Sequence, residues 1–155
     1  MTQRPRVLVV HGPNLSDLGR REPARYGSVT LEALDRRLRA RGETLGCDVT
    51  CVQSDAESTL AAVIRDARDW AHGLVLNPGG LTHTSVVIRD AVLAAALPAV
   101  ECHITHPEAR ESFRRRSLVS AVCIGRVSGL GPGGYLLALD GLVAHLRGPD
   151  PGHDA

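Results

Sequence analysis

A chain of 155 residues, 43% of them hydrophobic, suffices to bury one core and is expected to form a single domain over residues 1–155. Its net charge of +1 gives no field that would attract nucleic acid or a membrane surface, and a strand-like run near the N-terminus argues against a signal peptide, so we expect a cytoplasmic location. All 18 cationic side chains are arginine, and the absence of lysine excludes Schiff-base chemistry, covalently held pyridoxal phosphate and a Walker-type phosphate loop.

The pattern of apolar runs indicates the fold class. Short runs of strand type occur at 6–11, 48–53, 73–76, 98–102 and 121–125. Because they show little polar alternation, they are typical of strands buried on both faces of a parallel sheet. With helices between them, these runs predict a doubly wound α/β fold around a five-stranded parallel sheet.

Helices are expected at 31–45, 58–72, 85–96 and 132–146, with a short one that begins at Pro107. The residues that can cap the starts of the first three are Thr30, Ser58, and Thr84 or Ser85. Gly46 can end the first helix in a left-handed conformation. We expect residues 148–155 (G-P-D-P-G-H-D-A) to be a flexible tail.

The loop after the first strand is a candidate for function, because ligands of doubly wound sheets bind beyond the carboxyl ends of the strands. It is much longer than the usual two to six residues of a strand–helix connection. The loop carries Asn14, Arg21 and Tyr26, and arginines beside a tyrosine can change its chemistry. Gly19 and Gly27 suit the hinges of a lid. The alternative is a surface excursion with solvated charges.

The loop after the third strand reads N-P-G-G-L-T-H-T-S at 77–85. Its two glycines let the backbone approach a ligand closely, and Asn77 and His83 are placed to hydrogen-bond that ligand. The alternative is a helix cap with an incidental histidine.

The fourth strand ends with a carboxylate and an imidazole. Glu101 and His103 alternate onto the same face, where the carboxylate can orient the ring and favour its protonated form, as a general acid requires. A buried histidine with a structural partner is the alternative. Beyond it, Arg110 and Arg114 are expected on one face of a helix, where they can receive an anionic ligand.

No metal or cofactor site is predicted. His103 and His106 could ligate a metal, but no clear third ligand accompanies them. The four cysteines form no C-x-x-C pair and are expected to be reduced and buried. The G-x-G-x-x-G match at 129–134 lies in the last strand–helix turn, with no following strand, so we expect it to serve backbone packing instead of dinucleotide binding.

Taken together, these segments resemble the type II 3-dehydroquinate dehydratases over about residues 6–147. The motifs that carry the resemblance are G-P-N-L at 12–15, G-R-R-E-P at 19–23, N-P-G-G-L-T-H-T-S at 77–85, E-C-H-I-T at 101–105, F-R-R-R-S at 113–117 and G-L-G-P-G-G-Y at 129–135. The resemblance implies a flavodoxin-like fold of three layers (α/β/α) and a homo-oligomer, a dodecamer built from trimers. It implies no cofactor.

The implied reaction is the reversible elimination of water from 3-dehydroquinate to 3-dehydroshikimate through an enolate, in the shikimate pathway of aromatic amino acid biosynthesis or in quinate catabolism. By the resemblance, Tyr26 is the base. Forming tyrosinate near pH 7 costs roughly 4 kcal/mol, and one arginine about 4 Å away contributes about as much. Arg21 is the first candidate for that arginine and Arg114 the second, while Asn14 stabilises the enolate oxygen.

The resemblance also assigns the acid and the substrate contacts. His103, oriented by Glu101, protonates the departing hydroxyl group. The implied substrate-binding residues are Asn77, His83, Asp90, Ile104, Thr105 and Arg114. Of these, Asp90 matches a position that reaches the site of a neighbouring subunit.

Three residues depart from the family pattern. His11 stands where asparagine commonly precedes Gly-Pro-Asn, Thr105 where serine is usual, and His106 where asparagine is usual. These changes affect substrate affinity more than reaction type. Two other functions stay open from the sequence: a sister dehydratase acting on a related cyclic acid, and a flavodoxin-like small-molecule binding module without catalysis.

Overall fold

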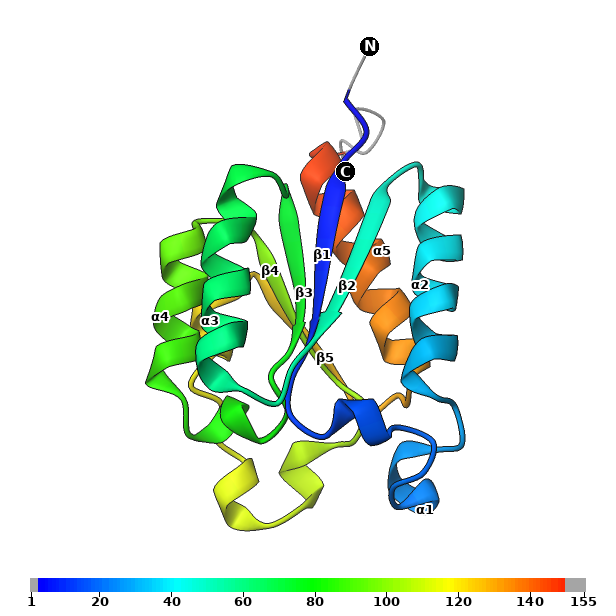
Figure 1. The fold of residues 1–155 in the computed structure, drawn as a ribbon, viewed down its shortest axis with the longest axis vertical. Helices are drawn as coiled ribbons and strands as arrows, with labels where there is room; N and C mark the ends of the chain where they lie inside the picture. Colours follow the sequence, from blue (N-terminus) through cyan, green and yellow to red (C-terminus); the bar gives the residue numbers. More distant parts are fainter. Residues whose placement is uncertain (1–2, 150–155) are drawn as a thin grey trace.

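The computed structural model describes residues 3–149 and has five parallel strands in one sheet (Figure 1). The strands are β1 (Arg6–His11), β2 (Asp48–Gln53), β3 (Gly73–Asn77), β4 (Ala99–His103) and β5 (Gly125–Ser128). Their order across the sheet is β2-β1-β3-β4-β5. The helices are α1 (Pro23–Tyr26), α2 (Leu31–Leu45), α3 (Glu57–Asp66), α4 (Val86–Ala95) and α5 (Gly133–Arg147). The predicted doubly wound α/β fold is therefore confirmed.

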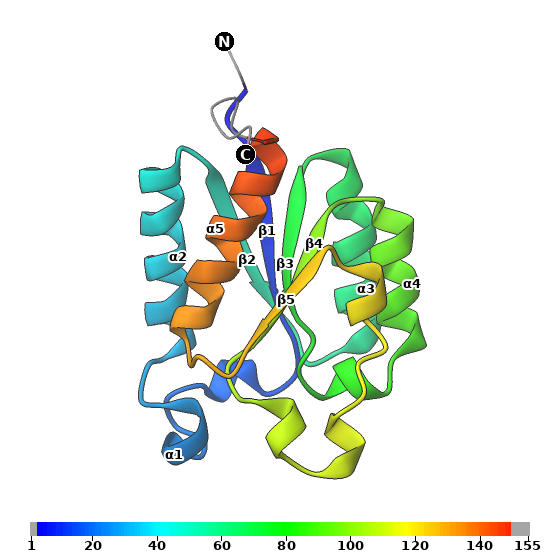
Figure 2. The same cartoon turned by 180° about the vertical axis from the view of Figure 1, so that it is seen from behind.

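Helices cover both faces of the sheet. Figures 1 and 2 show α2 and α5 on one face and α3 and α4 on the other. The interior strand β1 has an apolar sequence without alternation because both of its faces are buried. Val7 and Val9 enter the core shared with α2 and α5, whereas Leu8 and Val10 enter the core shared with α3 and α4. A strand with a core on each side needs an apolar residue at every position.

The predicted caps are confirmed at two of the three helices. Thr30 Oγ1 accepts a hydrogen bond from Ala33 N at 3.1 Å, and Gly46 ends the same helix with φ 69°. Ser85 Oγ accepts from Ile88 N at 2.9 Å at the start of α4. The prediction for Ser58 is wrong, because Ala56 occupies the N-cap of α3 without a side-chain bond. The helix also stops at Asp66 and continues only as the 3₁₀ turn Ala67–Asp69.

Two further predictions are wrong in the last third of the chain. The apolar run at 121–125 lies mostly in the 3₁₀ turn Ser120–Val122, and β5 comes after it. As an edge strand β5 pairs with β4 alone, so it needs no continuous apolar run. The helix expected around Arg110 and Arg114 is replaced by two 3₁₀ turns, Pro107–Ala109 and Ser112–Arg114, because Arg110 has an extended backbone (φ −102°, ψ −159°) between them.

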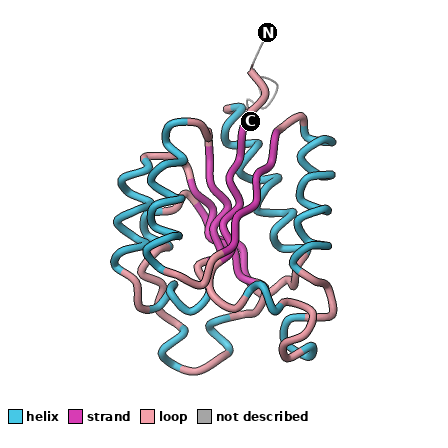
Figure 3. The backbone as a smooth tube through the Cα atoms, viewed as in Figure 1, coloured by secondary structure: helices cyan, strands magenta, loops and turns pink. Residues whose placement is uncertain are grey.

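The loops that follow β1, β3 and β4 gather at one end of the sheet, at the bottom of the view in Figure 3. The strand ends are level there, since His11 pairs with Gln53 on one side and with Asn77 on the other. Of the expected tail, residues 150–155 lie outside the described residues. Among residues 3–149, no helix has the length and apolar character needed to cross a membrane.

Candidate active site

A cavity of about 150 Å³ lies at the carboxyl ends of the strands. This is smaller than the pockets of roughly 300–1,000 Å³ that hold drug-sized ligands, so it suits a small molecule. The expected site residues that line it are Asn14, Arg21, Tyr26, Asn77, His83, His103, Ile104, Thr105 and Arg114. Two expected residues do not line it: Glu101 is fully buried, and Asp90 is exposed on α4. The sheet thus brings segments distant in sequence to one cavity.

Glu101 holds the ring of His103 through a hydrogen bond. The two side chains extend from β4, and His103 Nε2 donates to Glu101 Oε1 at 2.9 Å. Two hydroxyl groups also donate to this carboxylate, Ser117 Oγ at 2.7 Å and Ser120 Oγ. Because Nε2 is held, Nδ1 is the ring nitrogen of His103 available to a ligand in the cavity.

The carboxylate of Glu101 is stabilised in its ionised form. Burial alone raises the pKa of this group, but the hydrogen bonds from His103, Ser120 and Ser117 outweigh burial and lower it to about 2. Arg126 Nε adds an ion pair at 3.5 Å from Oε2. This charged carboxylate accepts from Nε2 and so orients the imidazole of His103 toward the cavity.

Tyr26 lies among arginines, but the arginine that hydrogen-bonds its hydroxyl is not Arg21, the expected one. Arg110 Nη1 donates to Tyr26 Oη at 3.2 Å and to Thr105 Oγ1 at 3.3 Å. Arg21 stacks on the ring instead, with its Cζ 5.6 Å from the ring centroid. Arg114 is paired with Glu111 at 2.8 Å. The residue in hydrogen-bond contact with the phenol is therefore Arg110, which the sequence reasoning had not assigned to this role.

Arg110 is held at the cavity by the same extended backbone that prevents a helix there. Its Nε is buried and has no hydrogen-bond partner within residues 3–149, although it lies 3.8 Å from Glu111 Oε2. The signal that could have found Arg110 was its position shortly after His103, at the end of a strand. The expected helical spacing indicated Arg110 and Arg114 together as ligands for an anion, and the family resemblance then assigned only Arg114 to the site.

Asn77 and His83 come from the loop after β3. Asn77 is 4% exposed, and both ends of its side-chain amide are hydrogen-bonded. Nδ2 donates to Tyr135 Oη at 2.9 Å, and Oδ1 accepts from Gly79 N at 3.1 Å. His83 Nδ1 lies 2.7 Å from the carbonyl oxygen of Arg116. Burial lowers the pKa of His83, and this carbonyl partly offsets the effect. His83 is thus favoured as a neutral ring whose Nε2 can accept a hydrogen bond.

Asn14 lies at the start of the long loop after β1, the loop that we expect to contain a lid. Its backbone is left-handed (φ 68°), and its N–H donates to Asp55 Oδ1 at 2.9 Å, which fixes the turn and leaves the side chain to line the cavity. The proposed hinges Gly19 and Gly27 have φ of 89° and 76°, a region that glycine adopts without strain. Their conformations are consistent with a lid, whose movement stays a prediction.

The glycine-rich turn at 129–134 supports the cavity from outside. Gly129 N donates to the carbonyl oxygen of His103 at 3.3 Å, and Gly131 N donates to that of Ile104 at 3.0 Å. Gly129 has φ 84°, and a Cβ atom there would lie 3.2 Å from His106 Cβ. The G-x-G-x-x-G match is used for backbone packing in this structure. His106 does not line this cavity but lines a second one of about 580 Å³.

The comparison with known proteins agrees with this geometry. A family model described as dehydroquinase class II matches residues 5–143. The 3-dehydroquinate dehydratase of Deinococcus radiodurans is 50% identical over 142 residues, 91% of this chain and 99% of the relative. That of Acaryochloris marina is 45% identical over 93% of this chain and 97% of the relative.

Solved structures give the same result. The type II dehydroquinase from Propionibacterium acnes superposes with a TM-score of 0.88 at 41% identity, over 93% of this chain and 99% of that one. The type II dehydroquinase from Butyrivibrio crossotus gives a TM-score of 0.87 at 36% identity, over 90% and 97%. The match spans both sequence and fold along nearly the whole length, and the chain therefore belongs to the class II dehydroquinase family.

Proposed function

We propose that this cavity eliminates water from 3-dehydroquinate to give 3-dehydroshikimate through an enolate. The chain is a hydro-lyase of its family, and the proposal assigns the residues that perform the steps. One observation carries it: a single cavity holds a tyrosine hydroxyl bonded to an arginine and a histidine bonded to a buried, ionised carboxylate. These are the base and the acid that an elimination beside a ketone requires.

Tyr26, as tyrosinate, removes a proton from the carbon next to the ketone. Ionising a tyrosine near pH 7 costs roughly 4 kcal/mol relative to its free pKa. The cation placed to stabilise a tyrosinate is the Arg110 guanidinium, whose Nη1 donates to Tyr26 Oη at 3.2 Å. The charge of Arg21 over the ring supplies a further contribution. Arg110 and Arg21 therefore share the role that we first expected of Arg21 with Arg114.

The electron pair of the broken C–H bond moves to the ketone oxygen, which becomes an enolate. Asn14 lines the cavity and supplies the amide dipole, directly or through a water molecule, that stabilises this oxygen. When the enolate collapses, the C–O bond to the β-hydroxyl breaks, and His103 Nδ1 donates the proton that lets the hydroxyl leave as water. Glu101 stabilises the imidazolium before that transfer.

The other residues at the cavity bind the substrate. The backbone of Ile104 and the hydroxyl of Thr105 receive its carboxylate, and His83, Arg114 and Asn77 bind or position its ring hydroxyls. Asp90 does not line the cavity of its own chain, and we propose that it reaches the site of a neighbouring subunit in a trimer-based dodecamer. We further propose that the enzyme acts in the cytoplasm, in the shikimate pathway.

The test is a direct assay without added metal or cofactor. Purified protein is mixed with 3-dehydroquinate, and the conjugated enone of the product is followed by ultraviolet absorbance. We expect the wild type to generate this signal and Tyr26→Phe to lose nearly all turnover while it still binds ligand by calorimetry. Retained turnover in Tyr26→Phe would remove Tyr26 from the mechanism, and an inactive wild type would contradict the proposed function itself.

A further inference from the structure

A buried row of hydrogen bonds runs from the side of α2 to the amide of Asn77. Asp35 Oδ1 lies 2.8 Å from His11 Nε2, and His11 Nδ1 lies 2.9 Å from Tyr135 Oη. Tyr135 Oη in turn accepts from Asn77 Nδ2 at 2.9 Å. His11 and Tyr135 are both completely buried, so neither has water as an alternative partner. The row joins four elements and ends in the wall of the active-site cavity.

The chemistry of the partners fixes the direction of every bond. A carboxylate only accepts, so His11 donates from Nε2 to Asp35, and Nδ1 is then the buried acceptor that faces the hydroxyl of Tyr135. The single hydroxyl hydrogen of Tyr135 fills that Nδ1, which leaves Tyr135 Oη only its lone pairs toward Asn77. Asn77 must therefore present its NH₂ group to Tyr135 and its oxygen to Gly79 N, as the structure shows.

This direction prevents a 180° flip of the Asn77 amide. A flipped amide would place its oxygen against a tyrosine that has no hydrogen to give, and its NH₂ against the N–H of Gly79. Each of these two contacts would leave a buried polar group without a hydrogen-bond partner, which costs the desolvation free energy of that group. The second N–H of Asn77 and a lone pair of its oxygen are thus held in one orientation.

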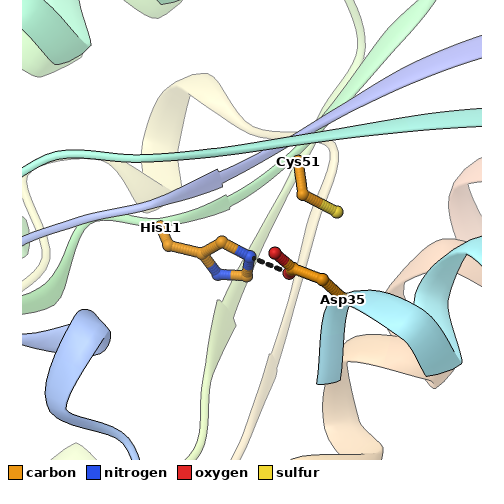
Figure 4. A group of neighbouring side chains, drawn as sticks. All are labelled: His11, Asp35 and Cys51. Atoms are coloured by element: carbon orange, nitrogen blue, oxygen red, sulfur yellow. Dashed lines mark hydrogen bonds and ion pairs between the residues drawn. The ribbon is translucent and has the colours of Figure 1, made fainter. Parts of the chain in front are cut away.

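Figure 4 shows the outer end of the row, where the ring of His11 on β1 faces Asp35 on α2 with Cys51 of β2 beside them. Three such side chains could also ligate a metal. Here, however, both ring nitrogens of His11 already have hydrogen-bond partners. Burial and the hydrogen bond to Asp35 raise the pKa of the Cys51 thiol to about 12, which disfavours the thiolate that a metal needs. The contacts favour a hydrogen-bonded support.

We propose that Asp35, His11 and Tyr135 are positioning residues that act through Asn77, by holding its amide in the one orientation that serves the elimination. The inference rests on the proposed function of the cavity, and it deepens that function by extending the machinery to residues that do not line the cavity. It also gives His11, which stands where the family usually has asparagine, a defined role in this chain.

The decisive experiment is a double-mutant cycle. Tyr135→Phe removes only the hydroxyl, and we expect kcat to fall roughly 10- to 100-fold, the effect of a misplaced active-site group, with KM nearly unchanged. In an Asn77→Ala background the same substitution should have no further effect on kcat, because the residue through which it acts is gone. An equal fall in both backgrounds, or no fall in the first, would overturn the proposal.

A second set of variants covers the case in which Tyr135→Phe folds poorly. His11→Leu removes the acceptor for the Tyr135 hydroxyl and should lower kcat similarly, whereas His11→Asn places an oxygen near the position of Nδ1 and should restore most of the turnover. Cys51→Ala is the matched control, because Cys51 touches Asp35 but lies outside the row. If His11→Leu and His11→Asn had equal kcat, a role for the acceptor would be refuted.

A readout that does not depend on turnover separates this proposal from the proposed function. The chain has only two asparagines, Asn14 and Asn77, so asparagine-selective ¹⁵N labelling and solid-state NMR resolve the Asn77 amide. We expect its two NH₂ protons to have well-separated shifts that converge in Tyr135→Phe. Unchanged shifts would overturn the positioning role, whereas a wild type that holds Asn77 but does not convert 3-dehydroquinate would contradict only the proposed function.

Discussion

Replacing Glu101 by glutamine removes a charge that the fold stabilises strongly. The hydrogen bonds around it lower its pKa from the usual 4.5 to about 2. At about 1.4 kcal/mol for each pH unit, this difference corresponds to roughly 3 kcal/mol of folding stability. Because the pKa is lowered in the folded state, this stability is fully present above pH 4.5 and is lost as the pH falls toward 2. The loss of folding stability in Glu101→Gln should therefore be complete above pH 4.5 and should disappear as the pH falls toward 2.

The assay is urea unfolding of wild type and Glu101→Gln at equal protein concentration, from pH 7 down to pH 2. The two curves should differ by roughly 3 kcal/mol at pH 7 and converge near pH 2. Glu108→Gln is the control, because Glu108 also pairs with Arg126 but is partly exposed, so its loss should cost at most about 1 kcal/mol. Turnover of Glu101→Gln should fall more than substrate binding. Equal stability at pH 7, or a deficit that persists at pH 2, would refute the reasoning.

Two further predictions concern the base and the assembly. Arg110→Met keeps the unbranched apolar part of the side chain but removes the charged hydrogen bond to Tyr26, worth about 1.5–3 kcal/mol, so kcat should fall roughly 10- to 100-fold. Arg115→Met, a neighbouring exposed arginine, should leave it unchanged, and equal activity of both variants would argue against Arg110. The cross-subunit role of Asp90 predicts that specific activity falls on dilution below the assembly threshold, measured with light scattering alongside turnover; a fully active monomer would refute it.

The sheet could be predicted from the sequence because a strand that is buried on both faces has a continuous run of apolar residues. In the interior strands β1, β3 and β4 the apolar runs coincide with the strands to within a residue. The edge strand β5 has no such signature, since one side of it lacks a partner, and the apolar run before it was mistaken for the strand. Capping could be predicted where a side chain makes the bond, as at Thr30, and not at Ala56, where none does.

The site could be predicted as far as it depends on strand ends, because parallel strands bring their carboxyl ends to one edge. The residues that were missed depend on three-dimensional detail. Arg110 reaches Tyr26 only because its own backbone is extended, which helical spacing could not indicate. The pairing of His11 with Tyr135 depends on the docking of α5 against β1, and no local pattern reports such a contact.

That pairing has a consequence for how the protein is made. His11 and Tyr135 lie 124 positions apart, in the first strand and the last helix. A contact of such long range cannot form until α5 is present, so the support of Asn77 is completed only by that helix. On the ribosome, β1 to β4 and the loop after β1 emerge before the tyrosine that completes the support of Asn77. A nascent chain that lacks α5 therefore contains every residue that lines the cavity and still has no finished site.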